Sequence, residues 1–195
     1  AQCILRLNPE PPGFFEGGEI LYKGQDVLKM SKKEIRKIRG REIGFVFQDP
    51  MTSLNPTMRV GAQIEEVFLG RTDVSKKEVK ERAMDIMRLV GISDVEKRYK
   101  QYPHELSGGM KQRVMIAIAL VSRPSVIICD EPTTSLDVTI EAQILDLLLE
   151  LREKLGTSII MITHDLGVIS RLCDRVVVMY GGKIVEKGEI AEIFY

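Results

Sequence analysis

One apolar run that ends in two adjacent carboxylates limits the possible folds of this chain of 195 residues more than any other feature. Residues 126–129 are all apolar and are followed directly by Asp130 and Glu131. Further apolar runs lie at residues 43–47 and 158–163, and segments with helical spacing of apolar residues separate the three. Buried strands that alternate with helices predict a mostly parallel sheet covered on both faces.

The two carboxylates are a candidate ligand site, because parallel sheets bind ligands at the carboxyl ends of their strands. A carboxylate such as Asp130 can hold Mg²⁺ against nucleotide phosphates. Its neighbour Glu131 can polarise an attacking water. This is a Walker-B pattern, and by itself it is weak, since a strand that ends at a helix N-cap produces the same residues by chance.

A second segment predicts an anion site at the start of a helix. Ser107 is a good N-cap residue, and Gly108 and Gly109 allow a phosphate to approach the backbone closely. The helix N-terminus adds free N–H groups and the positive end of the helix dipole. An ordinary glycine-rich helix start is the alternative, and the full octet argues against it: Leu106-Ser107-Gly108-Gly109-Met110-Lys111-Gln112-Arg113.

The octet resembles the signature motif of the ABC ATPase family, with Met110 where the family often has Gln. Four more of the family's motifs occur around it in the expected order. Gln48 matches the Q-loop, Asp130 and Glu131 match Walker B, and His164 matches the H-loop. The D-loop is matched by Ser135-Leu136-Asp137. The resemblance covers essentially the whole chain.

A finer resemblance concerns the ATPase subunits of oligopeptide, dipeptide and nickel importers. It rests on the strings that follow Phe47 and Thr163, which read Phe47-Gln48-Asp49-Pro50-Met51-Thr52-Ser53-Leu54-Asn55-Pro56 and Thr163-His164-Asp165-Leu166-Gly167-Val168. These strings do not identify the imported substrate.

The family resemblance implies the fold and its division. We expect an α/β fold with a RecA-like P-loop NTPase core over residues 1–48 and 122–195. A helical subdomain over residues 49–121 would carry the signature, and a small antiparallel β element would complete the nucleotide-binding domain. The helical spacing over residues 76–90, after a capping box that begins at Ser75, agrees with this expectation.

The resemblance also implies a role for each motif residue. Glu131 would be the general base that orients water towards the γ-phosphate of ATP, and His164 would contact that phosphate. Gln48 would reach Mg²⁺ and the water, and Asp130 would support Mg²⁺. A lone histidine or glutamine after a strand is more often a structural loop residue, so these roles depend on the motif series.

The remaining motif residues would serve the nucleotide of a second ATPase subunit, since the family packs two domains head to tail. Ser107, Gly108, Gly109 and Gln112 would close on that nucleotide, and Asp137 would cross the same interface. Transmembrane permease subunits and, indirectly, a substrate-binding protein would be the other partners. Whether the two ATPase subunits of the pair are identical or different stays open.

The printed sequence contains no G-x-x-x-x-G-K-[ST] loop, which is the family's main contact with the β- and γ-phosphates. The family places this loop just upstream of Ala1 and continues past Tyr195. We therefore expect a truncated or incompletely recorded chain that binds ATP poorly and does not hydrolyse it, and an intact parent that is an ATPase.

Composition narrows the remaining classes. Basic and acidic residues both number 28, so no global charge favours nucleic acid or an anionic membrane. Apolar runs fall short of the roughly 20 residues that a membrane span needs, and three dispersed cysteines point to a reducing compartment. We expect a peripheral protein on the cytoplasmic face of the cell membrane, held there by its partners.

Two alternatives stay open within this reading. A non-transport ABC ATPase of the DNA-repair or chromosome-organising type would carry long coiled-coil arms, and the segment between Gln48 and Ser107 is too short for them. A non-catalytic module would supply only its signature helix to a partner's site. The presence of both Glu131 and His164 argues against it, and the missing phosphate loop argues for it.

Overall fold

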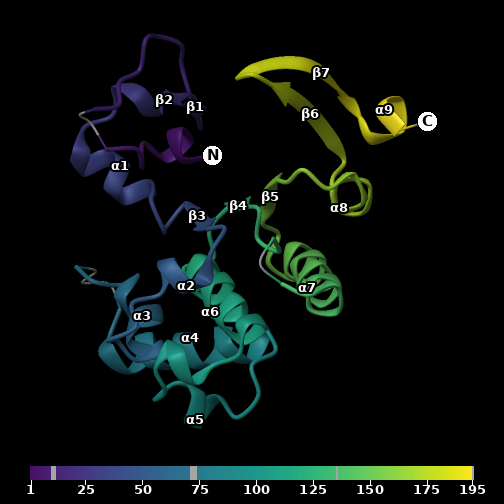
Figure 1. Cartoon of the computed structure of the whole chain (residues 1–195). Helices are drawn as coiled ribbons and strands as arrows, with labels where there is room; N and C mark the ends of the chain where they lie inside the picture. The colour runs from purple at the N-terminus through teal and green to yellow at the C-terminus, as the bar shows by residue number, and fades with distance from the viewer. Residues whose placement is uncertain (10–11, 71–73, 135, 195) are drawn as a thin grey trace.

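The computed structural model of the chain describes residues 1–9, 12–70, 74–134 and 136–194 (Figure 1). Its centre is a three-stranded parallel sheet in the order β3-β4-β5. The strands are β3 (Ile43–Val46), β4 (Val126–Asp130) and β5 (Ser158–Ile162), each one of the apolar runs that the sequence marks as a buried strand. The expected α/β fold with a parallel sheet is confirmed.

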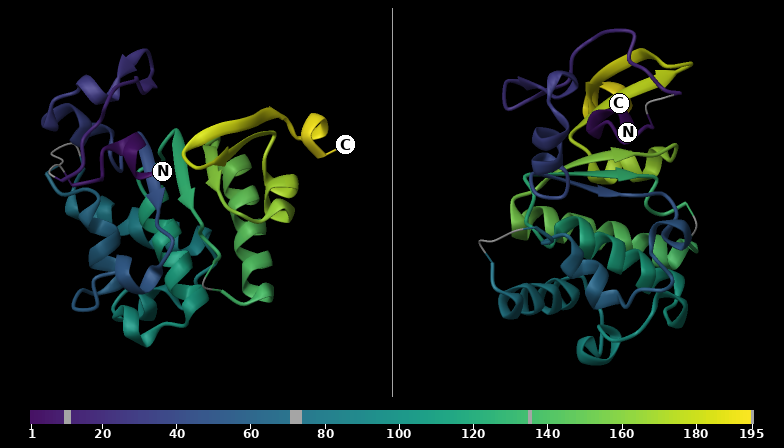
Figure 2. Two further views of the ribbon diagram at one scale, coloured as in Figure 1. Left: turned by 45° about the horizontal axis from the view of Figure 1, so that its top comes forward. Right: turned by 90° about the vertical axis from the view of Figure 1, so that its left-hand side faces the viewer.

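One face of the sheet packs on the two longest helices near it. These are α6 (Gly108–Leu120) and α7 (Val138–Leu155), which lie side by side beneath the sheet in both views of Figure 2. Successive strand residues point to opposite faces, so Ile127 and Cys129 face the helices. They belong to the largest cluster of buried apolar residues, which also contains Ile144 and Leu148 of α7.

The other face is covered only in part by the described residues. A smaller cluster joins Leu5 and Ile38 of the N-terminal region to Ile43 of β3 and Ile128 of β4. Over β5 this cover is incomplete: Ile162 packs against the cluster, whereas Ile160 is 42% exposed. The expectation of a sheet covered on both faces therefore holds for β3 and β4 and only in part for β5 within the part of the chain described.

Helices fill the chain between β3 and β4, as expected, and with α6 they form a group that we call the helical block (Figure 1). Val60, Ile64, Met87 and Val90 bury their side chains against α6. Before α6, the block contains α2 (Pro50–Ser53), α3 (Val60–Glu66), α4 (Lys76–Leu89), α5 (Val95–Arg98) and the 3₁₀ helix η3 (Pro103–Glu105).

Short elements and antiparallel pairs complete the described chain. The N-terminal region contains the 3₁₀ helices η1 (Gln2–Leu5) and η2 (Val27–Lys29), α1 (Lys32–Ile38), and the antiparallel pair β1 (Leu21–Tyr22) and β2 (Gln25–Asp26). The C-terminal region contains α8 (Leu166–Leu172), the antiparallel pair β6 (Arg175–Tyr180) and β7 (Lys183–Glu189), and α9 (Ile190–Phe194).

The capping box predicted at Ser75 forms only in half, whereas a complete box stands at the start of α1. At α1 both bonds form, since Ser31 accepts from the Glu34 backbone and the Glu34 side chain accepts from the Ser31 backbone. At α4 the Ser75 side chain accepts from the backbone of Glu78, and the Glu78 carboxylate instead pairs with Arg82 at 2.6 Å. A salt bridge one turn along the helix thus replaces the second half of the box.

A close approach joins the sheet to α6. A Cβ atom on Gly44 of β3 would lie 2.4 Å from the backbone carbonyl oxygen of Ala119, a distance that real Cβ atoms do not reach. Only glycine permits the strand to pass this near the helix. None of the helices in the described ranges is both long and apolar enough to cross a lipid bilayer.

Candidate functional site

Three of the predicted site residues meet at one edge of the parallel sheet. Gln48 lies two residues after the end of β3, Glu131 directly follows β4, and His164 lies two residues after the end of β5. Neighbouring parallel strands end at the same edge, so residues far apart in the chain come together there. The structure therefore brings together the Q-loop, Walker-B and H-loop residues that the sequence singled out.

The Glu131 carboxylate is the centre of this group. Gln48 Nε2 donates a hydrogen bond to Glu131 Oε2 at 2.7 Å, and the Thr134 hydroxyl donates to the same oxygen at 3.0 Å. The other oxygen, Oε1, lies 3.2 Å from His164 Nδ1. We refer to these four residues as the Glu131 cluster. The cluster holds both oxygens of one carboxylate at the sheet edge.

The surroundings of Glu131 favour its ionised form. The hydrogen bonds from His164 and then Thr134 hold the pKa of the Glu131 carboxyl below its usual value. Its side chain is 26% exposed and that of His164 is 74% exposed, so the cluster opens to solvent at the sheet edge. A carboxylate that is fixed, ionised and accessible can accept a proton from a water bound in front of it.

Backbone geometry at Glu131 is unusual for a residue with a side chain. Its φ of 47° lies in the left-handed region, where non-glycine residues are uncommon. Its backbone N–H donates to the Ile162 carbonyl at 2.9 Å, which extends the β4–β5 pairing by one residue. This bond holds the strained residue in place, and such strain concentrates at functional sites.

Asp130 and Gln48 offer oxygen ligands of the kind that Mg²⁺ prefers. Asp130 ends β4 directly before Glu131, and Gln48 uses its amide nitrogen towards Glu131, so its amide oxygen is left for another contact. No three His, Cys, Asp or Glu residues in the described ranges gather closely enough to hold a metal. The pair Asp130 and Gln48 fits Mg²⁺, because this ion usually takes one or two carboxylates and completes its shell with substrate phosphates and water.

The segment predicted to bind an anion forms the N-terminus of α6. Ser107 caps the helix by accepting from the backbone N–H of Met110 at 3.4 Å, and both Ser107 and Gly108 are exposed. Gly109 packs tightly on α7, since a Cβ there would lie 2.8 Å from Ile140 Cγ2. The segment therefore presents a backbone surface to solvent at the start of α6, where free N–H groups can meet an anion.

The D-loop residue Asp137 lies beside this surface. It is exposed, and its carboxylate caps α7 by accepting from the Ile140 backbone at 3.0 Å. Leu136 lies against Gly108, where it would be 3.9 Å from an added Cβ. Ser135, the first residue of the predicted motif, lies outside the described residues. The capping role of Asp137 is one that the motif did not predict.

Gln112 does not lie on the surface where the sequence placed it. Its side chain is completely buried within the helical block, and neither its amide oxygen nor its amide nitrogen has a hydrogen-bond partner among the described residues. A group in that position cannot contact the nucleotide of another subunit. The prediction that Gln112 binds the cofactor is therefore corrected, because the turn of α6 carries it into the interior.

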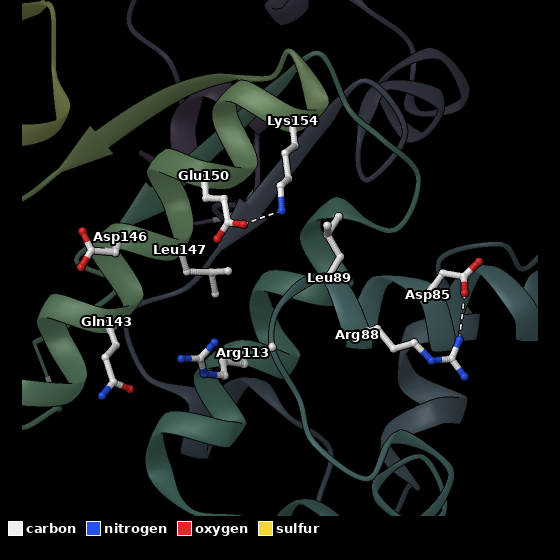
Figure 3. A pocket seen from close by; sticks show the side chains of 10 residues that line it. Asp85, Arg88, Leu89, Arg113, Gln143, Asp146, Leu147, Glu150 and Lys154 are labelled. Atoms are coloured by element: carbon white, nitrogen blue, oxygen red, sulfur yellow. Dashed lines mark hydrogen bonds and ion pairs between the residues drawn. The ribbon is translucent and has the colours of Figure 1, made fainter.

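One cleft between helices lies away from the Glu131 cluster. It has a volume of about 700 Å³ and is lined by α4, α6 and α7 (Figure 3). Most charged side chains in it pair within their own helix, as Arg88 does with Asp85 and Lys154 does with Glu150. Other contacts join different helices. Arg88 also pairs with Glu96 of α5, Asp146 accepts from Arg171 of α8, and the Arg113 guanidinium donates to the Val90 carbonyl at the end of α4 at 2.6 Å. Sequence reasoning did not assign these contacts.

Known proteins resemble the chain over its whole length. The sequence profile of the family described as ABC transporter matches residues 2–134. The oligopeptide transport ATP-binding protein OppD of Bacillus subtilis is 57% identical over 195 residues, which are 100% of this chain and 54% of that protein. The dipeptide transport ATP-binding protein DppD of Bacillus subtilis is 50% identical and is covered to 58%.

Solved structures agree with the sequence relatives. CbiO1 of Clostridium perfringens, part of the ABC transporter complex CbiONQ, superposes with a TM-score of 0.79 at 34% identity, over 92% of this chain and 68% of its own. The ATP-binding cassette MJ0796, in a dimeric post-hydrolysis state with ADP and Pi, gives a TM-score of 0.77 at 29% identity, over 90% of this chain and 74% of its own.

The chain spans about half the length of the curated relatives that it matches. Within that span it has the RecA-like α/β fold of an ATP-binding cassette, and the motif residues Gln48, Glu131 and His164 meet at its sheet edge. The chain belongs to the ABC transporter family, as the family profile, the sequence identities to the relatives and the structural superpositions agree.

Proposed function

We propose that this chain is the ATP-binding and ATP-hydrolysing part of the subunit that drives an ABC importer of oligopeptides or dipeptides. The proposal of ATP hydrolysis rests on the Glu131 cluster, in which Gln48 and His164 fix one carboxylate at the sheet edge. The proposal of peptide import is supported by relatives named for oligopeptide and dipeptide transport.

In the proposed reaction, Glu131 accepts the proton of the attacking water. Gln48 donates to one carboxylate oxygen and His164 contacts the other, so the carboxylate is held in one orientation before the nucleotide arrives. His164 then serves as the contact to the γ-phosphate. Mg²⁺, when bound by Asp130 and Gln48 together with the phosphates, neutralises their charge.

A second ATPase subunit completes the proposed site. Ser107, Gly108, Gly109 and Asp137 are proposed to face the nucleotide of that subunit in a head-to-tail pair. Support comes from the exposure of Ser107, Gly108 and Asp137 on adjoining segments, and from the dimeric, ADP-bound state of the cassette MJ0796. Whether the second subunit is another copy or a paralogue is left to experiment.

The further parts of the proposal concern organisation and partners. We propose that residues 49–121 act as the helical subdomain and that residues 1–48 and 122–195 form the ATPase core. The helical subdomain and the segment after Gln48 would meet transmembrane permease subunits, which would hold the protein at the cytoplasmic face of the membrane. A substrate-binding protein would act indirectly, and nucleic acid would play no part.

The chain of 195 residues, as printed, is proposed to be inactive by itself, because it lacks a G-x-x-x-x-G-K-[ST] loop. The intact mass of the natural protein identifies the form to assay, since 22.0 kDa corresponds to the printed chain. ATP turnover by a larger form that contains the loop, and none by the 195-residue chain, is the expected result. Turnover by the 195-residue chain would contradict the inactivity, and no turnover by the larger form would contradict the catalytic proposal.

The second candidate is a non-catalytic module that lends its signature helix to a partner. The missing phosphate loop is the observation that favours it. In that case the natural protein would lack the loop, bind a second, catalytically competent subunit and raise that subunit's turnover, while Glu131→Gln would change nothing. Under our proposal, Glu131→Gln abolishes turnover at the site that contains it.

A further inference from the structure

The two oxygens of the Glu131 carboxylate have different numbers of contacts. Gln48 Nε2 at 2.7 Å and the Thr134 hydroxyl at 3.0 Å both donate to Oε2. Within the described part of the chain, Oε1 contacts only His164 Nδ1, at 3.2 Å. A carboxylate oxygen has about two lone-pair sites. Two donors therefore fill Oε2, while Oε1 keeps a site for a further proton.

The two donors to Oε2 are held by different parts of the chain. Gln48 lies in the loop that leads into the helical block, since α2 begins at Pro50. Thr134 lies three residues after Glu131 in the same turn, where its backbone N–H donates to the Glu131 carbonyl oxygen at 3.4 Å. A movement of the helical block relative to the sheet therefore displaces Gln48 and leaves Thr134 beside the carboxylate.

The turn that contains Thr134 is anchored in the core. Pro132 is buried, and its ring restricts the backbone directly after Glu131. Thr133 is 7% exposed, and its hydroxyl donates to Glu141 Oε1 of α7 at 2.6 Å. Threonine also has few side-chain rotamers, because it is branched at Cβ. The direction of the Thr134 hydroxyl is therefore set by a backbone that is fixed on both the sheet and α7.

We propose that Thr134 is a positioning residue that holds Glu131 Oε2 and so leaves Oε1 to take the proton of the attacking water. The inference rests on the proposed ATP hydrolysis and adds which carboxylate oxygen reacts and which residue selects it. In this step one O–H bond of the water breaks and its proton bonds to Oε1. The water oxygen bonds to the γ-phosphorus as the bond to the leaving oxygen of ADP breaks, and the carboxyl then returns the proton to solvent.

The test uses the natural protein in the form that contains the phosphate loop, with Thr134→Val as the main variant. Valine keeps the shape of threonine and removes the hydroxyl. We expect kcat for ATP to fall about 10-fold, as for one lost hydrogen bond to a charged group, and KM to stay unchanged. Thr134→Ser keeps the hydroxyl and should keep most of the rate. Thr139→Val makes the same change at an exposed residue of α7 and should have the wild-type rate.

Two further readouts show whether Thr134 acts through Glu131. In a Glu131→Gln background, Thr134→Val should lower kcat no further, because the group that Thr134 positions has lost its function as a base. At neutral pH, the carbon-13 resonance of the Glu131 carboxylate should shift in Thr134→Val and much less in Thr134→Ser. The second readout needs no turnover, so it tests the contact independently of the reaction.

The outcomes separate this inference from the proposed function. With wild-type turnover present, an unchanged kcat in Thr134→Val, an equal loss in Thr134→Ser or a further loss in the Glu131→Gln background would each overturn the inference alone. A lower kcat without a shift of the carboxylate resonance would show that Thr134 only helps the loop to fold, which also overturns it. No turnover by the wild-type form that contains the loop would overturn the proposed function and the inference together.

Discussion

Gln48 and Glu131 lie 83 positions apart in the chain, yet Gln48 Nε2 donates to Glu131 Oε2 at 2.7 Å. This bond links the loop that enters the helical block to the carboxylate at the sheet edge. Gln48 therefore cannot move away without leaving this oxygen of Glu131 to the Thr134 hydroxyl alone. The hydrogen bond thus links the position of the helical block to the contacts that orient the proposed base.

Replacing Glu131 by Gln should abolish ATP hydrolysis while leaving nucleotide binding intact. The amide has the same shape and cannot take a proton from water, and the loss of a general base lowers the rate by about 10²- to 10⁴-fold. Phosphate release by the form that contains the phosphate loop measures the rate, and ATP binding is measured in parallel. Glu186→Gln, on the exposed strand β7, is the control and keeps full activity. Retained turnover in Glu131→Gln would remove Glu131 from the catalytic role.

The titration of Glu131 should depend on His164. Contact with His164 is the largest cause of the lowered pKa of the Glu131 carboxyl, so His164→Ala should raise that pKa towards the usual 4.5. Because the folded-state pKa lies below the unfolded one, the carboxylate favours folding above pH 4.5 and loses that effect as pH falls through the folded-state value. Carbon-13 NMR of the Glu131 carboxyl measures the shift. His104→Ala removes the only other histidine and should leave it unchanged.

Gly109→Ala should disturb the start of α6, whereas Gly108→Ala should not. The new Cβ at 109 would lie 2.8 Å from Ile140 Cγ2, while at 108 its nearest neighbour is Leu136 at 3.9 Å. Overpacking of this kind costs about 1–3 kcal/mol. Urea unfolding of both variants gives the comparison. Adding Ile140→Ala to Gly109→Ala removes the clashing methyl and should narrow the difference; equal stability of the two single variants would contradict the packing.

Gly44→Ala should be among the most destabilising single changes in the sheet. Its Cβ would meet the Ala119 carbonyl oxygen at 2.4 Å, and a backbone atom inside a helix cannot move aside as a side chain can. We expect a loss of about 3 kcal/mol or more in the free energy of unfolding. Gly17→Ala, which meets nothing within 4 Å, serves as the control for the change of residue type. Similar unfolding midpoints would show that the strand and helix are further apart in solution.

The cysteines should differ sharply in their reaction with thiol reagents. Burial raises the pKa of the Cys129 thiol to about 12, so almost no thiolate exists near neutral pH, and the side chain has no access to reagent. Cys3 is exposed and should be labelled in the folded protein. Mass spectrometry after maleimide treatment, with and without urea, identifies the modified residues. Labelling of Cys129 without urea would show that β4 opens readily.

Much of the Glu131 cluster was predictable, because it depends on short-range order. Apolar runs predict β3, β4 and β5, and parallel neighbours necessarily place the residues that follow them at one edge. The direct bonds from Gln48 and His164 to Glu131 were not predictable, since loop side chains select among several partners only in three dimensions.

Other features depend on competition between local contacts and packing. The motif series gave Asp137 a contact across a subunit interface, and the structure shows that its carboxylate also caps α7, which begins at Val138. The motif series placed Gln112 at a nucleotide, and the rotation of α6 buries it instead. Neither the capping role of a motif residue nor the inward face of a mostly apolar helix can be read from the order of residues alone.

The tight contact between Gly44 and Ala119 joins the backbone of β3 to the last turn of α6 with no side chain between them. The helix has 13 residues and is about 20 Å long, and Ala119 lies at its far end from Ser107. The distance from the sheet to the exposed helix start is therefore set by the length of the helix itself, because the other end cannot approach the strand more closely.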